Sequence, residues 1–386
     1  MSVSVTLPRM MEIGGGAIAR VPDMVRNLNA SRVLLITDKT MVQFGYADKV
    51  QALLTQADIE SRVYADTIPE PTASSVNEAV QIAKDGGFDC LVALGGGSAI
   101  DSAKAISILA RFGGVMRDYK VPRIVNEEGL PIIAIPTTAG TGSEVTKFTV
   151  ITDDATDEKM LCVGLGFSPT AAIVDYELTM TLPARITADT GIDALTHAIE
   201  AYVSRKASPF SDFNALEAMR LIAPNLRKVY HTGSDTNARE SMMRGATLAG
   251  IAFSNASVAL VHGMSRPIGA FFHVPHGLSN AMLLPSITAF SIEAAPERYA
   301  KCAIAMGLAT ENDPIEVANT RLVEELDAIN QELNVPTLAE FGVSQDEFES
   351  VLETMIEQAL ASGSPSNNPR IPTPDEMKSL YRHLWS

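Results

Sequence analysis

Four side chains able to bind a divalent metal ion lie in two stretches of the chain. Asp193 and His197 are four residues apart in T-G-I-D-A-L-T-H, a spacing that places both on one face of a helix. His262 and His276 bracket a stretch rich in glycine and proline. One carboxylate and three imidazoles are a mixed donor set that suits Fe(II) or Zn(II) better than Mg or Ca. The residues therefore predict a metal site with room for a further ligand, such as a substrate oxygen.

Two glycine-rich turns indicate a second chemistry. Gly95–Ser98 follows an apolar run and opens a helical stretch, and P-T-T-A-G-T-G-S-E (136–144) follows another apolar run. Glycines let the backbone approach a phosphate, and a helix N-terminus offers free N–H groups at its positive end. The two turns together predict a site for the pyrophosphate and ribose of a nucleotide. Two turns without a ligand are the alternative.

Asp38 closes an early apolar run, R-V-L-L-I-T. An acidic residue there can hydrogen-bond a ribose hydroxyl and would repel a 2′-phosphate, which favours NAD over NADP. A solvated residue at the end of a strand is the alternative interpretation.

The elements that must position these residues differ between the two halves of the chain. Apolar runs predict buried parallel strands at 32–38, 89–98 and 131–144, with helices at 76–84 and 99–111 between them, and further strands near 148–153 and 171–175. The alternation predicts an α/β dinucleotide-binding domain with a parallel, Rossmann-like sheet over residues 1–183.

Beyond Leu182-Pro183 the chain is rich in Ala, Leu, Met and Glu. Helices are predicted at 192–203, 212–226, 238–252 and 315–333, with a short final helix after a turn-rich loop at 362–374. We therefore expect an all-α domain over residues 184–386 that carries the metal ligands.

Composition narrows the class of partner. The chain has 386 residues and a formal net charge of −16, which disfavours binding to nucleic acid or to an anionic membrane. The first residues lack a basic region followed by an apolar stretch, so we expect no signal peptide. The sequence has no uninterrupted apolar run of about 18 residues, so we expect no membrane span. The three cysteines, Cys90, Cys162 and Cys302, form no pair pattern, so we expect a reducing, cytoplasmic location.

At this point the sequence resembles the iron-dependent (group III) alcohol dehydrogenase family over nearly its whole length. The resemblance rests on G-G-G-S-A-I-D-S-A-K (95–104), P-T-T-A-G-T-G-S-E-V-T (136–146), T-G-I-D-A-L-T-H-A-I-E-A-Y-V-S (190–204) and H-G-M-S-R-P-I-G-A-F-F-H-V-P-H-G (262–277). It implies hydride transfer between NAD(H) and a small alcohol or aldehyde at a catalytic Fe(II), with Zn(II) as the alternative. It also implies a homodimer or a higher homo-oligomer.

The resemblance assigns roles to individual residues. Asp193, His197, His262 and His276 would hold the metal. The residues implied in NAD(H) binding are Asp38, Gly95, Gly96, Gly97, Ser98, Asp101, Thr137, Thr138 and Ser143, with weaker matches at Lys159 and Leu178. Phe148 and Phe253 would line the substrate side.

Arg266 departs from the family pattern, in which many members carry a further histidine four residues after the ligand at 262. Arginine stays protonated and cannot act as a general base at pH 7. His273 is the candidate to replace that histidine in proton transfer. We hypothesise that Arg266 meets an anionic group of the substrate. A structural salt bridge is the alternative.

Three other interpretations stay open. One is a member of the same superfamily that resembles glycerol dehydrogenases or dehydroquinate synthases. The second is a non-catalytic sensor that binds NAD and metal, and the third is a purely structural metal site. The sequence does not identify the alcohol, the native metal or the physiological direction.

Overall fold

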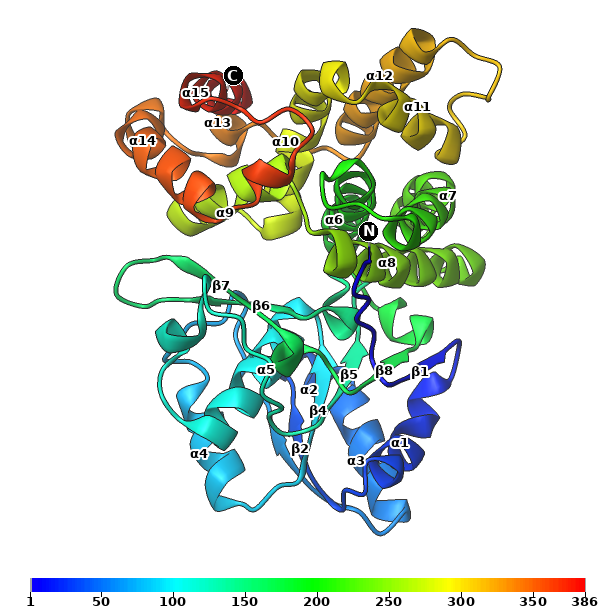
Figure 1. The fold of residues 1–386 in the computed structure, drawn as a ribbon. Coiled ribbons are helices and arrows are strands. Elements are labelled where there is room, and N and C mark those ends of the chain that lie inside the picture. The colour runs from blue at the N-terminus through cyan, green and yellow to red at the C-terminus, as the bar shows by residue number, and fades with distance from the viewer. Residues whose placement is uncertain (1, 386) are drawn as a thin grey trace. The chain divides into compact units, whose positions relative to one another are not determined.

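The computed structural model describes residues 2–385, which divide into two compact units. One unit is Thr6–Thr181. The other begins at Leu182 and includes the first residues of the chain. The two units have different architectures, as Figure 1 shows.

The first unit is built on a six-stranded sheet in the order β1-β8-β5-β4-β2-β3, and every neighbouring pair is parallel. Its strands are β1 (Met10–Ile13), β2 (Arg32–Ile36), β3 (Glu60–Tyr64), β4 (Cys90–Gly95), β5 (Ile132–Pro136) and β8 (Ala171–Val174). The strands predicted from the apolar runs are confirmed as β2, β4, β5 and β8. The predicted fold class, a parallel α/β region followed by a helical region, is confirmed.

Helices cover both faces of this sheet because successive side chains of each strand point to opposite sides. On one face, Leu34 and Leu91 belong to a core with α4 (Asn77–Asp85) and α5 (Gly97–Phe112). On the other face, Val33 and Val92 belong to a core with α1 (Val21–Asn27) and α3 (Tyr46–Gln56). The short helix α2 (Lys39–Gln43) follows β2. Burial on both faces explains why these strands read as continuous apolar runs.

The predicted strand near Phe148 exists, but it lies outside the parallel sheet. β6 (Phe148–Thr152) pairs with β7 (Lys159–Val163) in a separate antiparallel hairpin. β1, β3 and β7 were not predicted from the sequence. β3 alternates exposed and half-buried residues before a single buried one, so it carries no continuous apolar run.

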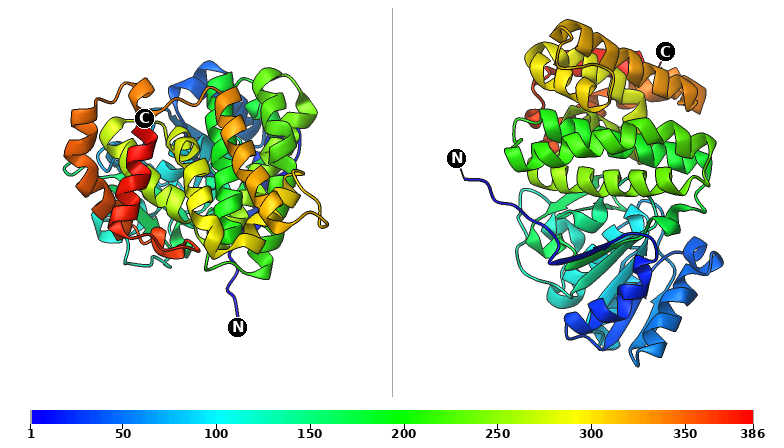
Figure 2. Two further views of the ribbon diagram at one scale, coloured as in Figure 1. Left: turned by 90° about the horizontal axis from the view of Figure 1, so that it is seen from above. Right: turned by 90° about the vertical axis from the view of Figure 1, so that its right-hand side faces the viewer.

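The second unit is helical throughout its regular structure. Its α-helices are α6 (Ala184–Val203), α7 (Pro209–His231), α8 (Thr236–Ala256), α9 (Leu260–Phe272), α10 (His276–Ser291), α11 (Pro296–Ala305), α12 (Ile315–Glu332), α13 (Leu338–Phe341), α14 (Gln345–Ala361) and α15 (Pro374–Trp385). Helices α6, α7 and α8 pack side by side, as Figure 2 shows. The four predicted helices are confirmed, although α6 begins at Ala184 rather than near Ile192.

Helices α9 and α10 were not predicted as helices because both contain residues that disfavour helix. Pro267 lies inside α9 and Pro285 inside α10. Within the described part of the chain, no single helix is long and apolar enough to span a membrane. The pair α8 and α9 passes that test only jointly, across a 104° bend, on length and composition.

Candidate functional site

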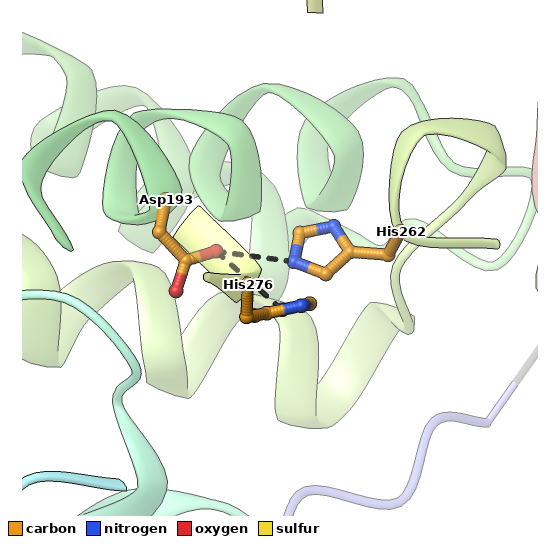
Figure 3. Close-up of side chains that lie close together, drawn as sticks. All are labelled: Asp193, His262 and His276. Carbon is orange, nitrogen blue, oxygen red and sulfur yellow. Dashed lines mark ion pairs between the residues drawn. The ribbon is translucent and has the colours of Figure 1, made fainter. Parts of the chain in front are cut away.

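Three of the predicted metal ligands meet in the helical unit. Asp193 comes from α6, His262 from α9 and His276 from the first turn of α10, and one donor atom from each lies within 4.8 Å of the others. Asp193 Oδ1 is 3.4 Å from His262 Nε2 and 3.8 Å from His276 Nε2. Dashed lines in Figure 3 mark these two ion pairs. Residues from three helices thus converge on one carboxylate oxygen.

The fourth predicted ligand lies beside them. His197 follows Asp193 by one turn of α6, and its Nε2 is 3.8 Å from Asp193 Oδ1. Its ring stacks between Phe253 and His262, with ring centroids 4.2 Å and 4.4 Å away. The structure therefore brings all four predicted ligands together, with Phe253 packed against one of them.

A close backbone approach helps to bring α10 to α6. A Cβ atom added to Gly277 would lie 2.2 Å from the carbonyl oxygen of Asp189, so only glycine fits there. Gly277 directly follows His276, and Asp189 precedes Asp193 by one turn. The separation of these two ligands is thus defined by backbone contact.

Glu200 supports the site, and sequence reasoning did not identify it. Its buried carboxylate accepts hydrogen bonds from the N–H groups of Ala259, at 2.9 Å, and Val261, at 2.6 Å. Glu200 Oε2 also lies 2.7 Å from His262 Nδ1. A carboxylate can only accept here, so Nδ1 carries a proton and Nε2 is the ring nitrogen directed at Asp193. Glu200 lies on α6 seven residues after Asp193, on the same face, which was the available signal.

Asn280 is a second functional residue that was missed. Its Nδ2 is 2.7 Å from Asp193 Oδ1, 3.1 Å from His262 Nε2 and 3.3 Å from His276 Nε2. The side chain is fully buried, and it lies one turn of α10 after His276. The two hydrogens of this amide are thus shared among three atoms that could ligate a cation.

The electrostatics of the cluster fit a bound cation. Burial alone would raise the pKa of Asp193, but the imidazoles of His197, His276 and His262 hold that pKa well below its usual range. Burial would lower the pKa of His262, yet the carboxylates of Asp193 and Glu200 raise it. A cluster of four N and O donors that stabilises positive charge, with one half-exposed member, is a suitable site for Fe(II) or Zn(II).

The two glycine-rich turns lie side by side at the carboxyl end of the parallel sheet. Gly95 ends β4 with φ at +154°, and it pairs with Pro136 at the end of β5. A Cβ atom on Gly97 would lie 2.8 Å from Thr141 Cγ2, so the turns touch there. Asp38 Oδ2 is 3.4 Å from the position of a Cβ on Gly95. The carboxyl edge of such a sheet is where nucleotides bind.

The residues present fit an anionic diphosphate. Helix α5 starts at Gly97 with no side-chain cap and no acidic residue in its first turn, so its N–H groups can receive a phosphate. Thr138 Oγ1 is buried and has no hydrogen-bond partner. Thr137 N–H donates to the Gly95 carbonyl at 3.0 Å, which ties the second turn to the first.

Two of the predicted cofactor residues are occupied with each other. Ser143 Oγ donates to Asp101 Oδ1 at 2.6 Å, and Asp101 Oδ2 accepts from the N–H of Val150 at 3.0 Å. The buried Lys104 Nζ donates to Ser143 Oγ at 2.9 Å and to the Phe148 carbonyl at 2.7 Å. Burial lowers the pKa of Lys104 to about 8, although the carboxylates of Asp101 and Glu144 oppose this shift. This network joins α5, the second turn and β6.

The remaining predicted cofactor residues have varied surroundings. Ser98 Oγ accepts from the N–H of Glu70 at 3.2 Å, and Lys159 Nζ pairs with Glu70 Oε1 at 2.8 Å. Glu70 was not identified from the sequence, and its φ of +51° is uncommon for a residue with a side chain. Leu178 packs its side chain into the core below the sheet.

His273 and Arg266 both come from α9. His273 is the exposed C-cap of α9, with φ at +54°, and no hydrogen bond, ion pair or ring contact in the described chain joins it to the ligand cluster. Arg266 lies one turn after His262, and its Nη1 donates to Ser364 Oγ at 3.0 Å.

Known proteins with the same organisation are readily found. The family model described as "Iron-containing alcohol dehydrogenase" matches residues 8–176, and "Fe-containing alcohol dehydrogenase family, C-terminal" matches residues 187–385. Long-chain-alcohol dehydrogenase 1 of Geobacillus thermodenitrificans (strain NG80-2) is 41% identical over 363 residues, which are 93% of this chain and 91% of that protein.

Solved structures agree. A 1,3-propanediol oxidoreductase superposes with a TM-score of 0.95 at 34% identity, covering 100% of both chains. Sulfoacetaldehyde reductase from Bifidobacterium kashiwanohense, solved in complex with NAD+, has a TM-score of 0.88 at 27% identity and covers 100% of this chain and 99% of that one. The resemblance inferred from the motifs is confirmed: the chain belongs to the iron-containing alcohol dehydrogenase family.

Proposed function

We propose that the protein is a metal-dependent, NAD(H)-linked alcohol dehydrogenase that also reduces the corresponding aldehyde. The observation that carries the proposal is the cluster of one carboxylate and three imidazoles, in which only His276 is half-exposed, supported by Glu200. A purely structural metal site has no need of a nucleotide-type sheet edge, and this chain contains both features.

Names of similar proteins support the substrate class. The Geobacillus relative is named a long-chain-alcohol dehydrogenase, and the solved neighbours are named for 1,3-propanediol and sulfoacetaldehyde. These compounds share a terminal hydroxyl or aldehyde and differ in the rest of the molecule. The proposed substrate is therefore a small alcohol or aldehyde.

In the proposed mechanism Asp193, His197, His262 and His276 hold the metal. When bound, Fe(II) or Zn(II) supplies Lewis acidity toward an alcohol or carbonyl oxygen, and NAD(H) supplies the hydride chemistry. Glu200 keeps the proton of His262 on Nδ1, so that Nε2 is available as a ligand.

The nucleotide is held by the sheet edge in the same proposal. The first N–H groups of α5 and the Thr138 hydroxyl receive the pyrophosphate, and Gly95, Gly96 and Gly97 allow its close approach. Asp38 selects NAD(H) by its negative charge. Asp101, Ser143 and Thr137 hold the two turns in place through their hydrogen bonds. Ser98 and Lys159 lie beside the turns, where both contact Glu70. Leu178 contributes through its backbone.

Location and assembly are part of the proposal. Cys90, Cys162 and Cys302 are buried free thiols, as expected for a reducing compartment, and we propose a cytoplasmic protein. We further propose a homodimer or a higher homo-oligomer. Light scattering of the purified protein measures its assembly directly.

The test is reconstitution. Protein purified without oxygen is stripped with a chelator, given Fe(II) or Zn(II), and assayed for NAD+ reduction with a panel of primary and secondary alcohols. We expect metal to restore turnover in the wild type and in Asp346→Asn, an exposed control on α14. The ligand variant Asp193→Asn should bind metal weakly and remain inactive. Stoichiometric metal binding by the wild type with no turnover of any alcohol, using NAD(H) or NADP(H), would favour a sensor and refute the proposal.

A further inference from the structure

Arg266 occupies an unusual position on α9. From Leu260 to Gly269 it is the one residue that is half-buried rather than buried, so part of its side chain is accessible. It lies four residues after His262 and therefore on the same face of the helix. A permanent positive charge is thus placed one turn from the ligand cluster.

The guanidinium of Arg266 is held at one end and open at the other. Nη1 donates to Ser364 Oγ, and this is the one hydrogen bond that Arg266 makes in the described chain. No carboxylate of the described residues lies within 4.0 Å of it. Nε and Nη2 make no hydrogen bond within the described chain, and neither atom is fully buried. Both therefore remain accessible to a ligand.

Two other arginines of the unit, the buried Arg239 and the half-buried Arg298, make several hydrogen bonds within the protein. Arg239 donates from Nε, Nη1 and Nη2 to Gly233 O, Thr187 Oγ1 and Leu182 O. Arg298 pairs with Asp212 and also donates to the Tyr202 carbonyl. Removing a guanidinium from water without hydrogen-bond acceptors is unfavourable. Neutral oxygens satisfy Arg239, and a carboxylate and a carbonyl satisfy Arg298. Arg266 is left with unused donors.

The anchor of Arg266 is built into the fold. A Cβ atom on Gly263 would lie 2.8 Å from Pro365 Cδ, so α9 and the 3₁₀ helix η7 (Pro365–Asn367) are in close contact beside Ser364. The N–H of Ser364 donates to Ser362 Oγ at 3.3 Å, and Ser364 is buried. The serine hydroxyl that orients the guanidinium is therefore itself held in place.

We propose that Arg266 is a specificity-determining residue that binds an oxyanion group, such as a carboxylate, sulfonate or phosphonate, at the far end of a short aldehyde or alcohol substrate. The proposal rests on the function proposed above and defines its substrate class. Two free donors of one planar guanidinium match two oxygens of such a group. Burial lowers the pKa of Arg266 to about 10, although the negative charge of Glu200 acts to raise it. The side chain is therefore still cationic at neutral pH.

The test compares matched substrates in the reducing direction. Metal-loaded enzyme with NADH is assayed with succinic semialdehyde, sulfoacetaldehyde and phosphonoacetaldehyde as the anionic aldehydes, and with butyraldehyde as the neutral one. The variants are Arg266→Gln, Arg266→Lys and the control Arg244→Gln, which removes an exposed arginine of α8 that forms no ion pair. We expect the ratio of kcat/KM between the best anionic aldehyde and butyraldehyde to fall about 10- to 100-fold in Arg266→Gln, mainly through KM, and less in Arg266→Lys. Arg244→Gln should keep the wild-type ratio.

A binding measurement gives a readout apart from turnover. Calorimetry with propionate, ethanesulfonate and ethylphosphonate should detect binding to the wild type with NADH and weaker binding to Arg266→Gln, and the best-bound anion identifies the group. An equal loss on neutral and anionic aldehydes, or a wild type that prefers butyraldehyde and binds none of the three anions, refutes the role of Arg266 while leaving the dehydrogenase intact. A wild type that reduces none of the aldehydes refutes the proposed function, and this inference with it.

Discussion

Glu200→Gln is the substitution that separates support of the metal site from metal ligation itself. The side chains are nearly identical in size, so packing of α6 is preserved. Glu200 receives three donors, the N–H groups of Ala259 and Val261 and the Nδ1–H of His262, on two carboxylate oxygens. Glutamine offers one oxygen and one NH₂ group, so at least one donor must face another donor.

Either orientation of the glutamine is unfavourable. With its NH₂ group at the Oε2 position, His262 must accept on Nδ1 and carry its proton on Nε2, the atom that faces Asp193. With its NH₂ group at the Oε1 position, the N–H of Val261 is left unpaired. A lost charge-assisted hydrogen bond in a buried site corresponds to about 2–3 kcal/mol. We therefore expect the free energy of unfolding of the metal-free protein to fall by about that amount.

Metal affinity should fall as well, by about 10- to 100-fold, because the hydrogen-bond partner of a ligating imidazole fixes its tautomer. The assay is competition for Zn(II) against a chromophoric chelator, combined with urea unfolding of the chelated protein. Glu324→Gln, an exposed residue of α12 with no ion pair, is the matched control. An affinity within threefold of wild type, together with reduced stability, would show that Glu200 stabilises the fold without orienting His262, and the reasoning would be refuted.

Three further predictions concern the first unit. Asp38→Asn retains a good cap for α2 but removes the charge, so the ratio of kcat/KM for NADPH over NADH should rise at least tenfold, and unchanged coenzyme preference would contradict the assignment. Gly97→Ala drives a methyl group against Thr141, so NADH affinity should fall and the free energy of unfolding should decrease by about 1–3 kcal/mol. Adding Thr141→Ser should recover part of both losses, and no recovery in the double variant would argue against this contact. Burial lowers the pKa of Lys104 from 10.5 in the unfolded chain to about 8 in the folded protein. Between these two pH values the unfolded chain binds a proton at Lys104 that the folded protein does not. The free energy of unfolding therefore rises with pH across that window. Relative to Lys104→Met, the wild type should therefore gain about 3 kcal/mol between pH 8 and pH 10.5 in chemical unfolding, and parallel pH curves would contradict the burial of a charge at this position.

The sequence was most informative where local pattern and burial agree. β2, β4 and β5 are buried on both faces, so hydrophobicity alone marks them. β3 and β7 each mix half-buried with buried or exposed residues and carry no such mark. For β6, the pattern indicated a strand, but pairing depends on which partner the chain reaches, and the antiparallel partner β7 lies beyond a turn that the pattern did not reveal.

The candidate site shows the same division. Its four predicted ligands could be selected because a carboxylate and three imidazoles are chemically distinctive. Glu200 could not be separated from an ordinary helix acid, since its role arises from contact with α9 about sixty residues later in the chain. Asn280 lies four residues after His276, but an amide has no distinctive chemistry until its neighbours are known. Nor could burial of Arg266 be foreseen, because α9 was not expected to be a helix.

The contact of Gly277 with the carbonyl of Asp189 has an evolutionary consequence. Backbone atoms meet there, so no side-chain substitution can widen or narrow the gap between α6 and the start of α10 without displacing a whole helix. Relatives that diverge in metal preference are therefore expected to change the identity of a donor atom while the spacing of the two helices stays the same. At this site we therefore expect substitutions to change which atoms bind the metal, while the main-chain contact keeps the distance between the two helices.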